Sequence, residues 1–222
     1  MKKIFLVVLS LITVFGLSAC KKEEAEIVFE VPNETYVNIQ ELPYAEYLKL
    51  SNPVVTISVH GMGDIKIQLF PSVAKGSVDN FIQYILDEAY TDNGFHRVIN
   101  GFMIQGGILE TPECGIVGEM NLNPDFTSTN ELSHSRGVLS MARIGTDYNS
   151  ATSQFFIMNG SSANLDGYYA AFGGVVSGFN VLDFIAGLND AEVNELPSSP
   201  VYIDGITVEL NGYVTGDRVC AE

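Results

Sequence analysis

Basic residues are scarce in this 222-residue chain, which has 11 lysines and arginines against 27 aspartates and glutamates. The formal net charge is −16. Nucleic-acid binding requires a basic surface that neutralises phosphates, so the composition argues against a nucleic-acid partner. The same acidity argues against a domain that lies flat on anionic lipid head groups. We interpret the acidity as a solvated surface.

Histidines are also few, and none of the three has metal-ligand spacing to a partner. His60 falls at the edge of a predicted hairpin and His134 falls in a loop. Gly106 and Gly107 resemble no phosphate-binding loop, because no lysine and helix follow them. We therefore expect no metal and no other cofactor.

The N-terminal apolar run is too short for a transmembrane helix. It covers residues 4–17, fourteen positions, whereas a ~30 Å hydrocarbon core needs about 20. Lys2 and Lys3 precede this run and small residues follow it, which is typical of an export signal. The sequence LSAC, residues 17–20, resembles the bacterial lipobox, in which the cysteine is lipidated before cleavage. The alternative is a buried N-terminal helix that ends at an ordinary cysteine.

These features predict the organisation of the N-terminal part. Residues 1–19 are a lipoprotein signal peptide, and the mature chain starts at a lipidated Cys20. Residues 21–52 contain seven glutamates and three lysines without a clean period, so we expect residues 20–52 to be an acidic tether. Whether the tyrosine-rich second half of the tether packs locally stays open. The predicted location is the bacterial cell envelope, outside the cytoplasm and anchored to a membrane through lipid.

Two cysteines remain after lipidation, Cys114 and Cys220. In an exported protein they could form a disulfide. The sequence does not say whether their Cα atoms lie within reach of each other, so this pairing also stays open.

The rest of the chain predicts one mainly β domain. Apolar residues make up 46% of the chain, enough for a sizeable core, and 21 glycines favour strands joined by turns. Two stretches have helical spacing, 77–90 and 180–188, with Ser77 and Asn180 at their starts. Many short strands with only two helices indicate a closed antiparallel barrel. The predicted strands lie within 53–70, 95–107, 137–143, 153–159, 169–176 and 202–210.

The stretch FHRVINGFMIQGG, residues 95–107, keeps Arg97 and Gln105 in a mostly apolar segment. Alone, it is typical of a hairpin with two solvated polar groups. Two further blocks follow in order: RGVLSMARIGTDYNSATSQFFIM (136–158) and NLDGYYAAFGGVVSGFNVLDFI (164–185). Together the three resemble the signatures of the cyclophilin-type peptidyl-prolyl cis-trans isomerases. The resemblance covers residues 53–210, which we take as the isomerase domain, and leaves residues 211–222 as a C-terminal tail.

The resemblance implies an eight-stranded antiparallel closed β-barrel capped by two α-helices, with the substrate groove on its outer surface. It implies that Arg97 is the catalytic residue. It also implies a proline pocket of Phe102, Met103, Phe156 and Leu165. The main chain of the substrate is then held by Gln105, by Gln154 and by the backbone of Ala142 and Arg143, with Tyr169 beside them.

The chemistry fits an arginine. Rotation of an X–Pro bond breaks amide resonance, a barrier of about 18–20 kcal/mol. In the twisted transition state the prolyl nitrogen regains its lone pair, so a donor aimed at it binds the transition state better than the planar ground state. Arg97 supplies N–H donors on a rigid, always charged plane. No nucleophile, metal or cofactor is required, and we assign His96 to structure, satisfied inside the barrel.

Three positions depart from the family pattern. Asn164 stands where many members have tryptophan or phenylalanine, Tyr169 where many have histidine, and Arg143 where asparagine is frequent. Loss of the aromatic at 164 removes apolar groove area, so we expect weak binding of the cyclic peptide cyclosporin.

We expect a monomeric isomerase that acts on proline-containing segments of exported proteins. The alternatives are a non-catalytic chaperone or adaptor that binds such segments, and a barrel that carries a small ligand inside.

Overall fold

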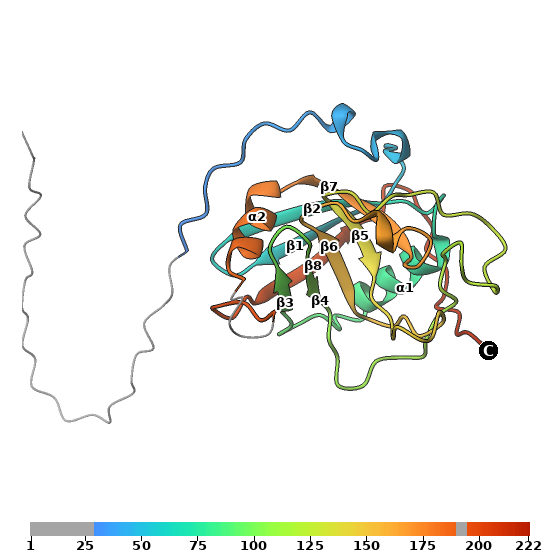
Figure 1. Cartoon of the computed structure of the whole chain (residues 1–222). Helices are drawn as coiled ribbons and strands as arrows, with labels where there is room; N and C mark the ends of the chain where they lie inside the picture. The colour runs from blue at the N-terminus through green and yellow to red at the C-terminus, as the bar shows by residue number, and fades with distance from the viewer. Residues whose placement is uncertain (1–28, 190–194) are drawn as a thin grey trace, which may run out of the picture.

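The computed structural model describes residues 29–189 and 195–222, so the predicted signal peptide and Cys20 lie outside the described residues. Eight antiparallel strands form one curled sheet in the order β3-β4-β6-β5-β7-β2-β1-β8 (Figure 1). The strands are β1 (Val54–Val59), β2 (Gly63–Leu69), β3 (Phe95–Ile99), β4 (Met103–Gly106), β5 (Val138–Met141), β6 (Phe155–Met158), β7 (Ala171–Ser177) and β8 (Ile203–Glu209). Every predicted strand segment contains one or two of them, except that β7 continues one residue past its segment.

The eight antiparallel strands that we expected are confirmed, and among the described residues they form a half-barrel that no continuous ladder closes. Strands β3 and β8 are its two ends, and an isolated bridge between Gly94 and Tyr202 joins their flanks. Beside the bridge, the Phe95 amide donates to the Val201 carbonyl at 3.0 Å. The chain before β8 cannot extend this ladder regularly, since prolines such as Pro200 have no N–H to donate.

Alternation along the strands separates an inner face from an outer face. Four residues in register across neighbouring strands are fully buried in the interior: Val98, Ile104, Ile157 and Leu139. The adjacent row points outward and contains Arg97, Gln105, Phe156 and Ser140. Because side chains alternate with period two, the same four strands supply both the core and a second row of side chains, polar and apolar, on the outer face.

Helices α1 (Lys75–Leu86) and α2 (Phe179–Gly187) lie on opposite sides of the curled sheet (Figure 1). Phe81 of α1 packs edge-on against Phe155 and Phe172, with ring centroids 5.2 and 5.5 Å apart. Three short 3-10 helices complete the elements, η1 (Ile39–Glu41), η2 (Ala45–Tyr47) and η3 (Ala163–Leu165). Among the described residues, no helix has the length and apolar character needed to cross a membrane.

Distant carboxylates cap both helices, and each helix begins before the residue expected at its start, Ser77 or Asn180. Helix α1 begins two residues earlier, and Glu119 accepts hydrogen bonds from the Ser77 amide and hydroxyl, each at 2.7 Å. Glu34 accepts from the amides of Gly178 and Phe179 at the start of α2. A carboxylate satisfies exposed N–H groups and opposes the positive end of the helix dipole, so a local cap is unnecessary.

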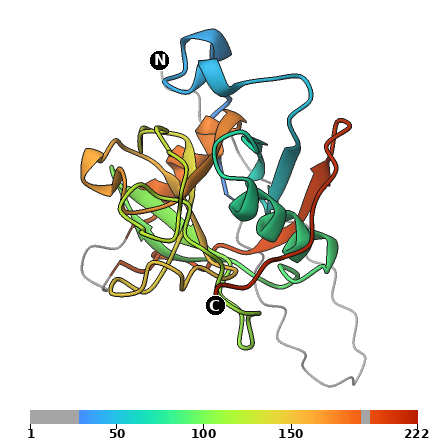
Figure 2. The ribbon, with the colours of Figure 1, turned by 90° about the vertical axis from the view of Figure 1, so that its right-hand side faces the viewer.

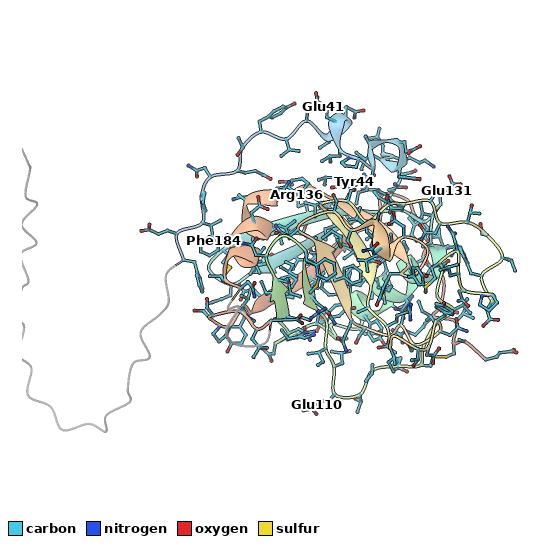
Figure 3. The ribbon with its side chains drawn as sticks, in the orientation of Figure 1. Glu41, Tyr44, Glu110, Glu131, Arg136 and Phe184 are labelled. Carbon is cyan, nitrogen blue, oxygen red and sulfur yellow. A yellow bond between two sulfur atoms is a disulfide. The ribbon has the colours of Figure 1, made fainter. Side chains whose placement is uncertain are left out.

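Residues 29–52, which we call the strap, pack on the domain, although the predicted tether includes them (Figures 1 and 2). Tyr44 of the strap is fully buried against the domain (Figure 3), and its hydroxyl donates to the Val175 carbonyl at 2.7 Å. Gly174 makes room for this ring, since a Cβ there would lie 2.4 Å from the Tyr44 Cε2 atom. At the start of the strap, Phe29 meets Phe184 of α2 edge-on. The tyrosine-rich half therefore contributes to the fold.

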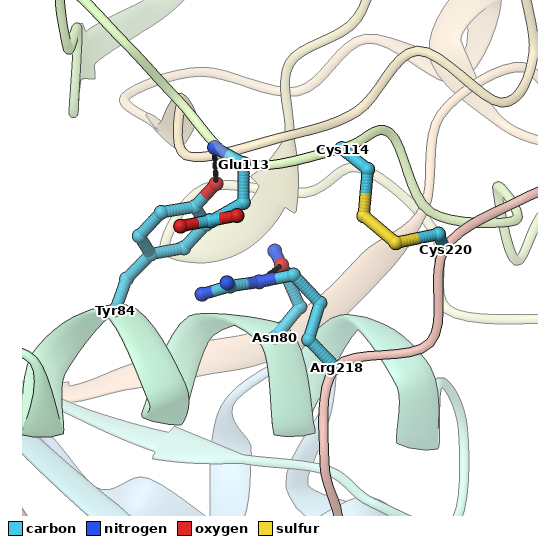
Figure 4. Close-up of a disulfide and its surroundings, with 6 residues drawn as sticks. All are labelled: Asn80, Tyr84, Glu113, Cys114, Arg218 and Cys220. Carbon is cyan, nitrogen blue, oxygen red and sulfur yellow. Dashed lines mark hydrogen bonds between the residues drawn. A yellow bond between two sulfur atoms is a disulfide. The ribbon is translucent and has the colours of Figure 1, made fainter.

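The C-terminal tail is tied to α1 and to the loop after β4. Cys114 and Cys220 form a disulfide with Cα atoms 5.6 Å apart, which settles the pairing that the sequence left open (Figure 4). The Arg218 guanidinium lies 4.0 Å from the centroid of the Tyr84 ring, and its Nε donates to Asn80 at 2.9 Å. The tail is thus held by both covalent and polar contacts.

Candidate active site

A β-bulge in β3 sets the direction of Arg97. Phe95 pairs with Gly106 and Arg97 with Gln105, so His96 is an extra residue in the ladder. Without it, Phe95 and Val98 would point to opposite faces, yet both are buried in the interior. The bulge resets the alternation and leaves Arg97 on the outer face, as bulges beside active sites often do.

A cavity of about 130 Å³ opens on this outer face. Nine of the ten residues predicted for catalysis and substrate binding line it: Arg97, Phe102, Met103, Gln105, Ala142, Arg143, Phe156, Leu165 and Tyr169. Strands β3, β4, β5 and β6, and the turns that follow them, bring these residues together. The tenth, Gln154, lines a neighbouring cavity of about 310 Å³ that shares Gln105, Ala142 and Arg143 with the first.

The Arg97 guanidinium is held on two sides. Its Nε donates to the Glu195 carboxylate at 2.5 Å, and its Nη1 makes a long hydrogen bond of 3.4 Å to Gln105. Gln105 in turn donates to Gln154 at 2.9 Å. Among the described residues, none accepts a hydrogen bond from Nη2. The hydrogen bond from Arg97, followed by its charge, lowers the pKa of Glu195.

The apolar floor belongs to a second hydrophobic cluster outside the main core. Met103 and Phe156 are buried in this cluster together with Tyr44 of the strap. Leu165 and Phe102 pack against it from the rim. The arrangement presents an apolar pocket beside a charged donor, which suits a ring that carries a polar nitrogen.

The comparisons with known proteins agree with this geometry. The family model of the cyclophilin type peptidyl-prolyl cis-trans isomerase/CLD matches residues 54–208. Peptidyl-prolyl cis-trans isomerase B of Escherichia coli is 38% identical over 158 residues, covering 66% of this chain and 94% of the relative. Peptidyl-prolyl cis-trans isomerase A of Dickeya dadantii is 37% identical over 159 residues, covering 66% and 80%. The chain belongs to the cyclophilin family of peptidyl-prolyl cis-trans isomerases.

Solved structures place this cyclophilin in the same fold. A crystal structure of a Cryptosporidium parvum cyclophilin type isomerase has a TM-score of 0.62 and 29% identity, with 71% of this chain and 97% of that chain covered. A second structure of that protein, in the presence of the dipeptide Ala-Pro, has a TM-score of 0.61 and 29% identity, with 70% and 98% covered. The predicted mainly β fold with two helices and the predicted isomerase activity are confirmed.

The pocket floor of this cyclophilin rests on a polar network of buried His134, buried Ser140 and half-buried Asp166. His134 stacks on Phe156, with ring centroids 6.0 Å apart and 19° between the planes. Its Nδ1 lies 2.9 Å from Asp166 and its Nε2 lies 3.1 Å from the Ser140 hydroxyl. The hydrogen bonds connect Ser, His and Asp in the same succession as in the catalytic triad of hydrolases. Because Ser140 is fully buried, this network supports the pocket and exposes no nucleophile.

Burial and hydrogen bonds determine which groups of this polar network are protonated. Burial lowers the pKa of His134, although the hydrogen bond and the charge of Asp166 oppose the shift. Burial alone would raise the pKa of Asp166, but hydrogen bonds from Ser133 and His134 lower it overall. His134 is therefore favoured as the neutral ring that separates the aspartate from Ser140.

One expectation about this cyclophilin changes at the rim. His96 is half-buried beside the bulge, and its Nδ1 has no hydrogen-bond partner among the described residues, so it is not satisfied inside the barrel. Burial and then the Arg97 charge lower the pKa of His96. Tyr169 meets Phe156 edge-on, and the Arg143 guanidinium lies 4.7 Å from the Tyr169 ring centroid.

The resemblance did not identify Glu195 or His134 as part of the site. Glu195 is 98 positions from Arg97 in the sequence, and no local pattern marks it. His134 lies inside no signature block, and its role depends on contacts with Phe156 and Ser140 from two strands. Only the folded arrangement connects either residue to the pocket.

Proposed function

We propose that this cyclophilin accelerates X–Pro rotation by donating a hydrogen bond from Arg97 to the prolyl nitrogen while the apolar pocket holds the proline ring. The observation that carries the proposal is the juxtaposition of the half-exposed Arg97 guanidinium with buried Met103 and Phe156 in one cavity. Nη2 is available for the substrate, since no described residue accepts from it.

Arg97 and the pocket share the work. Uncatalysed rotation takes roughly 10–100 s. A turnover of about a millisecond requires an acceleration of ~10⁵, or about 7 kcal/mol. One preorganised donor contributes about 3–4 kcal/mol, by comparison with an oxyanion-hole group. The remainder must come from fixing the proline ring while the neighbouring carbonyl turns.

The substrate main chain has polar partners beside the pocket. Gln105 and Gln154 are hydrogen-bonded to each other and lie between the two cavities. The backbone of Ala142 continues the same wall. The Cryptosporidium relative, whose structure was determined in the presence of Ala-Pro, supports proline-containing peptides as substrates. We propose that such a peptide lies across the two cavities of this chain.

Binding of an Ala-Pro tetrapeptide tests the location of the groove. In an NMR titration of the full chain, we expect amide shifts to concentrate at Phe102, Gln105 and Phe156. A separate cavity lined by Tyr202, on the far side of β3, serves as the internal control. Shifts that centre on Tyr202 and leave Gln105 unchanged would contradict the proposed groove.

We also propose that the protein is exported and tethered to a membrane through lipid on Cys20. The support is the signal-like residues 1–20 together with the disulfide, which is typical of oxidising compartments. In a bacterial host, mass spectrometry of the mature chain should find an acylated N-terminal Cys20, and Cys20→Ser should move the protein from the membrane to the soluble fraction. An uncleaved chain without lipid would contradict the tether but would leave the isomerase mechanism intact.

A further inference from the structure

Glu195 reaches the proposed catalytic site from the chain that runs beside β3. Its carboxylate Oε2 lies 2.5 Å from Arg97 Nε, and its side chain is 51% exposed. Its backbone is anchored as well, since the Glu195 carbonyl accepts a hydrogen bond of 2.7 Å from the Val98 amide. Glu195 therefore contacts β3 twice, once through its backbone and once through its side chain.

The backbone of Glu195 is unusual for a residue with a Cβ. Its φ is +66°, in the left-handed region that most non-glycine residues avoid. The hydrogen bond to Val98 holds this conformation and directs the carboxylate to the neighbouring Arg97. Residues with strained backbone cluster at functional sites.

The contacts of Arg97 divide its donors between protein and substrate. Glu195 takes the Nε edge of the guanidinium and Gln105 takes Nη1. Two contacts at different edges fix the guanidinium plane as well as its position. Nη2 donates to no described residue, so it is the donor that we assign to the prolyl nitrogen of the substrate.

We propose that Glu195 is a positioning residue that presets the Arg97 guanidinium for its donation to the prolyl nitrogen. The inference rests on the proposed function of Arg97. An arginine side chain that is mobile before binding must lose conformational entropy in the transition state, whereas one held in advance does not. The carboxylate occupies Nε only, so it orients the donor without occupying Nη2.

The opposite reading is that Glu195 competes with the substrate for Arg97. An exposed ion pair is weakly held, because water screens it, so it provides little energy for such competition. A positioning role needs only that one geometry be favoured. The two readings predict opposite changes in kcat, which makes them separable.

The test uses Glu195→Ala and Glu195→Gln in the full chain, assayed on an Ala-Pro peptide by NMR exchange. We expect Glu195→Ala to lower kcat by about threefold to fivefold, as much as an exposed ion pair can contribute, with little change in KM, since misplacement of a donor affects the transition state most. Glu195→Gln keeps an acceptor for Nε and should restore kcat to within about twofold. The Arg97 Hε–Nε cross-peak should broaden or exchange faster in Glu195→Ala and stay sharp in Glu195→Gln.

A matched control is available on α2. Asp183 forms a comparable pair with Arg136, at 2.6 Å and with the same 51% exposure, and neither lines the pocket. Asp183→Ala should leave kcat and the Arg97 cross-peak unchanged. In an Arg97→Ala background, Glu195→Ala should cause no further loss of kcat.

The outcomes separate the inference from the function. Loss of activity in Arg97→Ala with unchanged or raised kcat in Glu195→Ala would overturn the positioning role and leave the proposed function standing. An equal loss from Glu195→Ala in the Arg97→Ala background would also overturn it, because the effect would then be structural. Full activity in Arg97→Ala would overturn the proposed function, and the inference with it.

Discussion

At the scale of the residue, one extra residue in β3 determines which side chains face the interior and which face the groove. The bulge at His96 allows Phe95 and Val98 to share the interior while Arg97 faces the groove. The motif predicted that Arg97 and Gln105 belong together, and they are cross-strand partners. The bulge itself could not be predicted, because a one-residue slip in register is invisible until the partner strand is in place.

His134 makes stability depend on pH. Its folded-state pKa lies below the unfolded value of about 6.5, so the unfolded chain binds more protons between these two values. The free energy of unfolding should therefore fall as the pH drops from about 7 to 5. In His134→Gln, the free energy of unfolding measured by chemical denaturation should depend less steeply on pH. The remaining pH dependence is due in part to His96, whose pKa is also lowered.

At pH 8, where both rings are neutral, His134→Gln should cost about 1–3 kcal/mol through the disturbed hydrogen bonds to Asp166 and Ser140. This measurement gives the baseline of the variant. An identical pH slope in the variant and the natural chain would contradict the assignment.

Asn164 predicts weak binding of cyclosporin. It is exposed on η3 and does not line the pocket, although its neighbour Leu165 does. Asn164→Trp should add apolar groove area and tighten the Kd about tenfold, or ~1.4 kcal/mol, in calorimetry. Ser161→Trp, an exposed position in the preceding loop, is the control that should not change the Kd. Nanomolar binding by the unaltered chain would contradict this account.

At the scale of the element, residues distant in sequence complete what each local pattern begins. Alternation predicted the strands and helical spacing predicted both helices, because these signals depend on neighbouring residues. The capping groups Glu119 and Glu34 come from other parts of the chain. Local sequence offers Ser77 and Asn180 as caps, and tertiary contacts replace them.

The strap should be required for stability through Tyr44. Tyr44→Ala removes a fully buried ring and should lower the free energy of unfolding by about 3–5 kcal/mol. Tyr44→Phe loses only the hydrogen bond to Val175 and should cost about 1 kcal/mol. Urea denaturation of both variants provides the comparison.

The strap carries its own control. Tyr36 is 90% exposed, so Tyr36→Ala should change the free energy of unfolding by less than about 0.5 kcal/mol. If Tyr44→Ala were as mild as Tyr36→Ala, the strap would be a tether that merely touches the domain. Such a result would contradict its inclusion in the fold.

At the scale of the whole molecule, both ends of the described chain are fastened to the domain. Tyr44 anchors the strap at the N-terminal end, and the disulfide and Arg218 anchor the tail at the C-terminal end. The resemblance, which spans residues 53–210, could not foresee this because both ends lie outside it. Composition left the pairing of Cys114 with Cys220 open, since their separation of 106 residues gives no distance.

Reduction of the disulfide should destabilise the protein. Closing a long loop restricts the unfolded chain, so loss of the bond should cost about 2–4 kcal/mol and lower Tm by roughly 5–15 °C. Thermal unfolding with and without reductant measures this change. The double variant Cys114→Ser/Cys220→Ser should have the Tm of the reduced chain whether or not reductant is present. If reductant left the Tm of the unaltered chain unchanged, the bond would not contribute to stability.

The central claim is that Arg97 stabilises the twisted X–Pro bond, and exchange NMR on an Ala-Pro peptide measures it most directly. Arg97→Ala should lower kcat/KM by about 10²–10³-fold, the value of one preorganised donor. Arg97→Lys should recover little of this loss, since a point charge lacks the guanidinium plane. If Arg97→Ala catalyses exchange at the rate of the unaltered chain, the account is wrong.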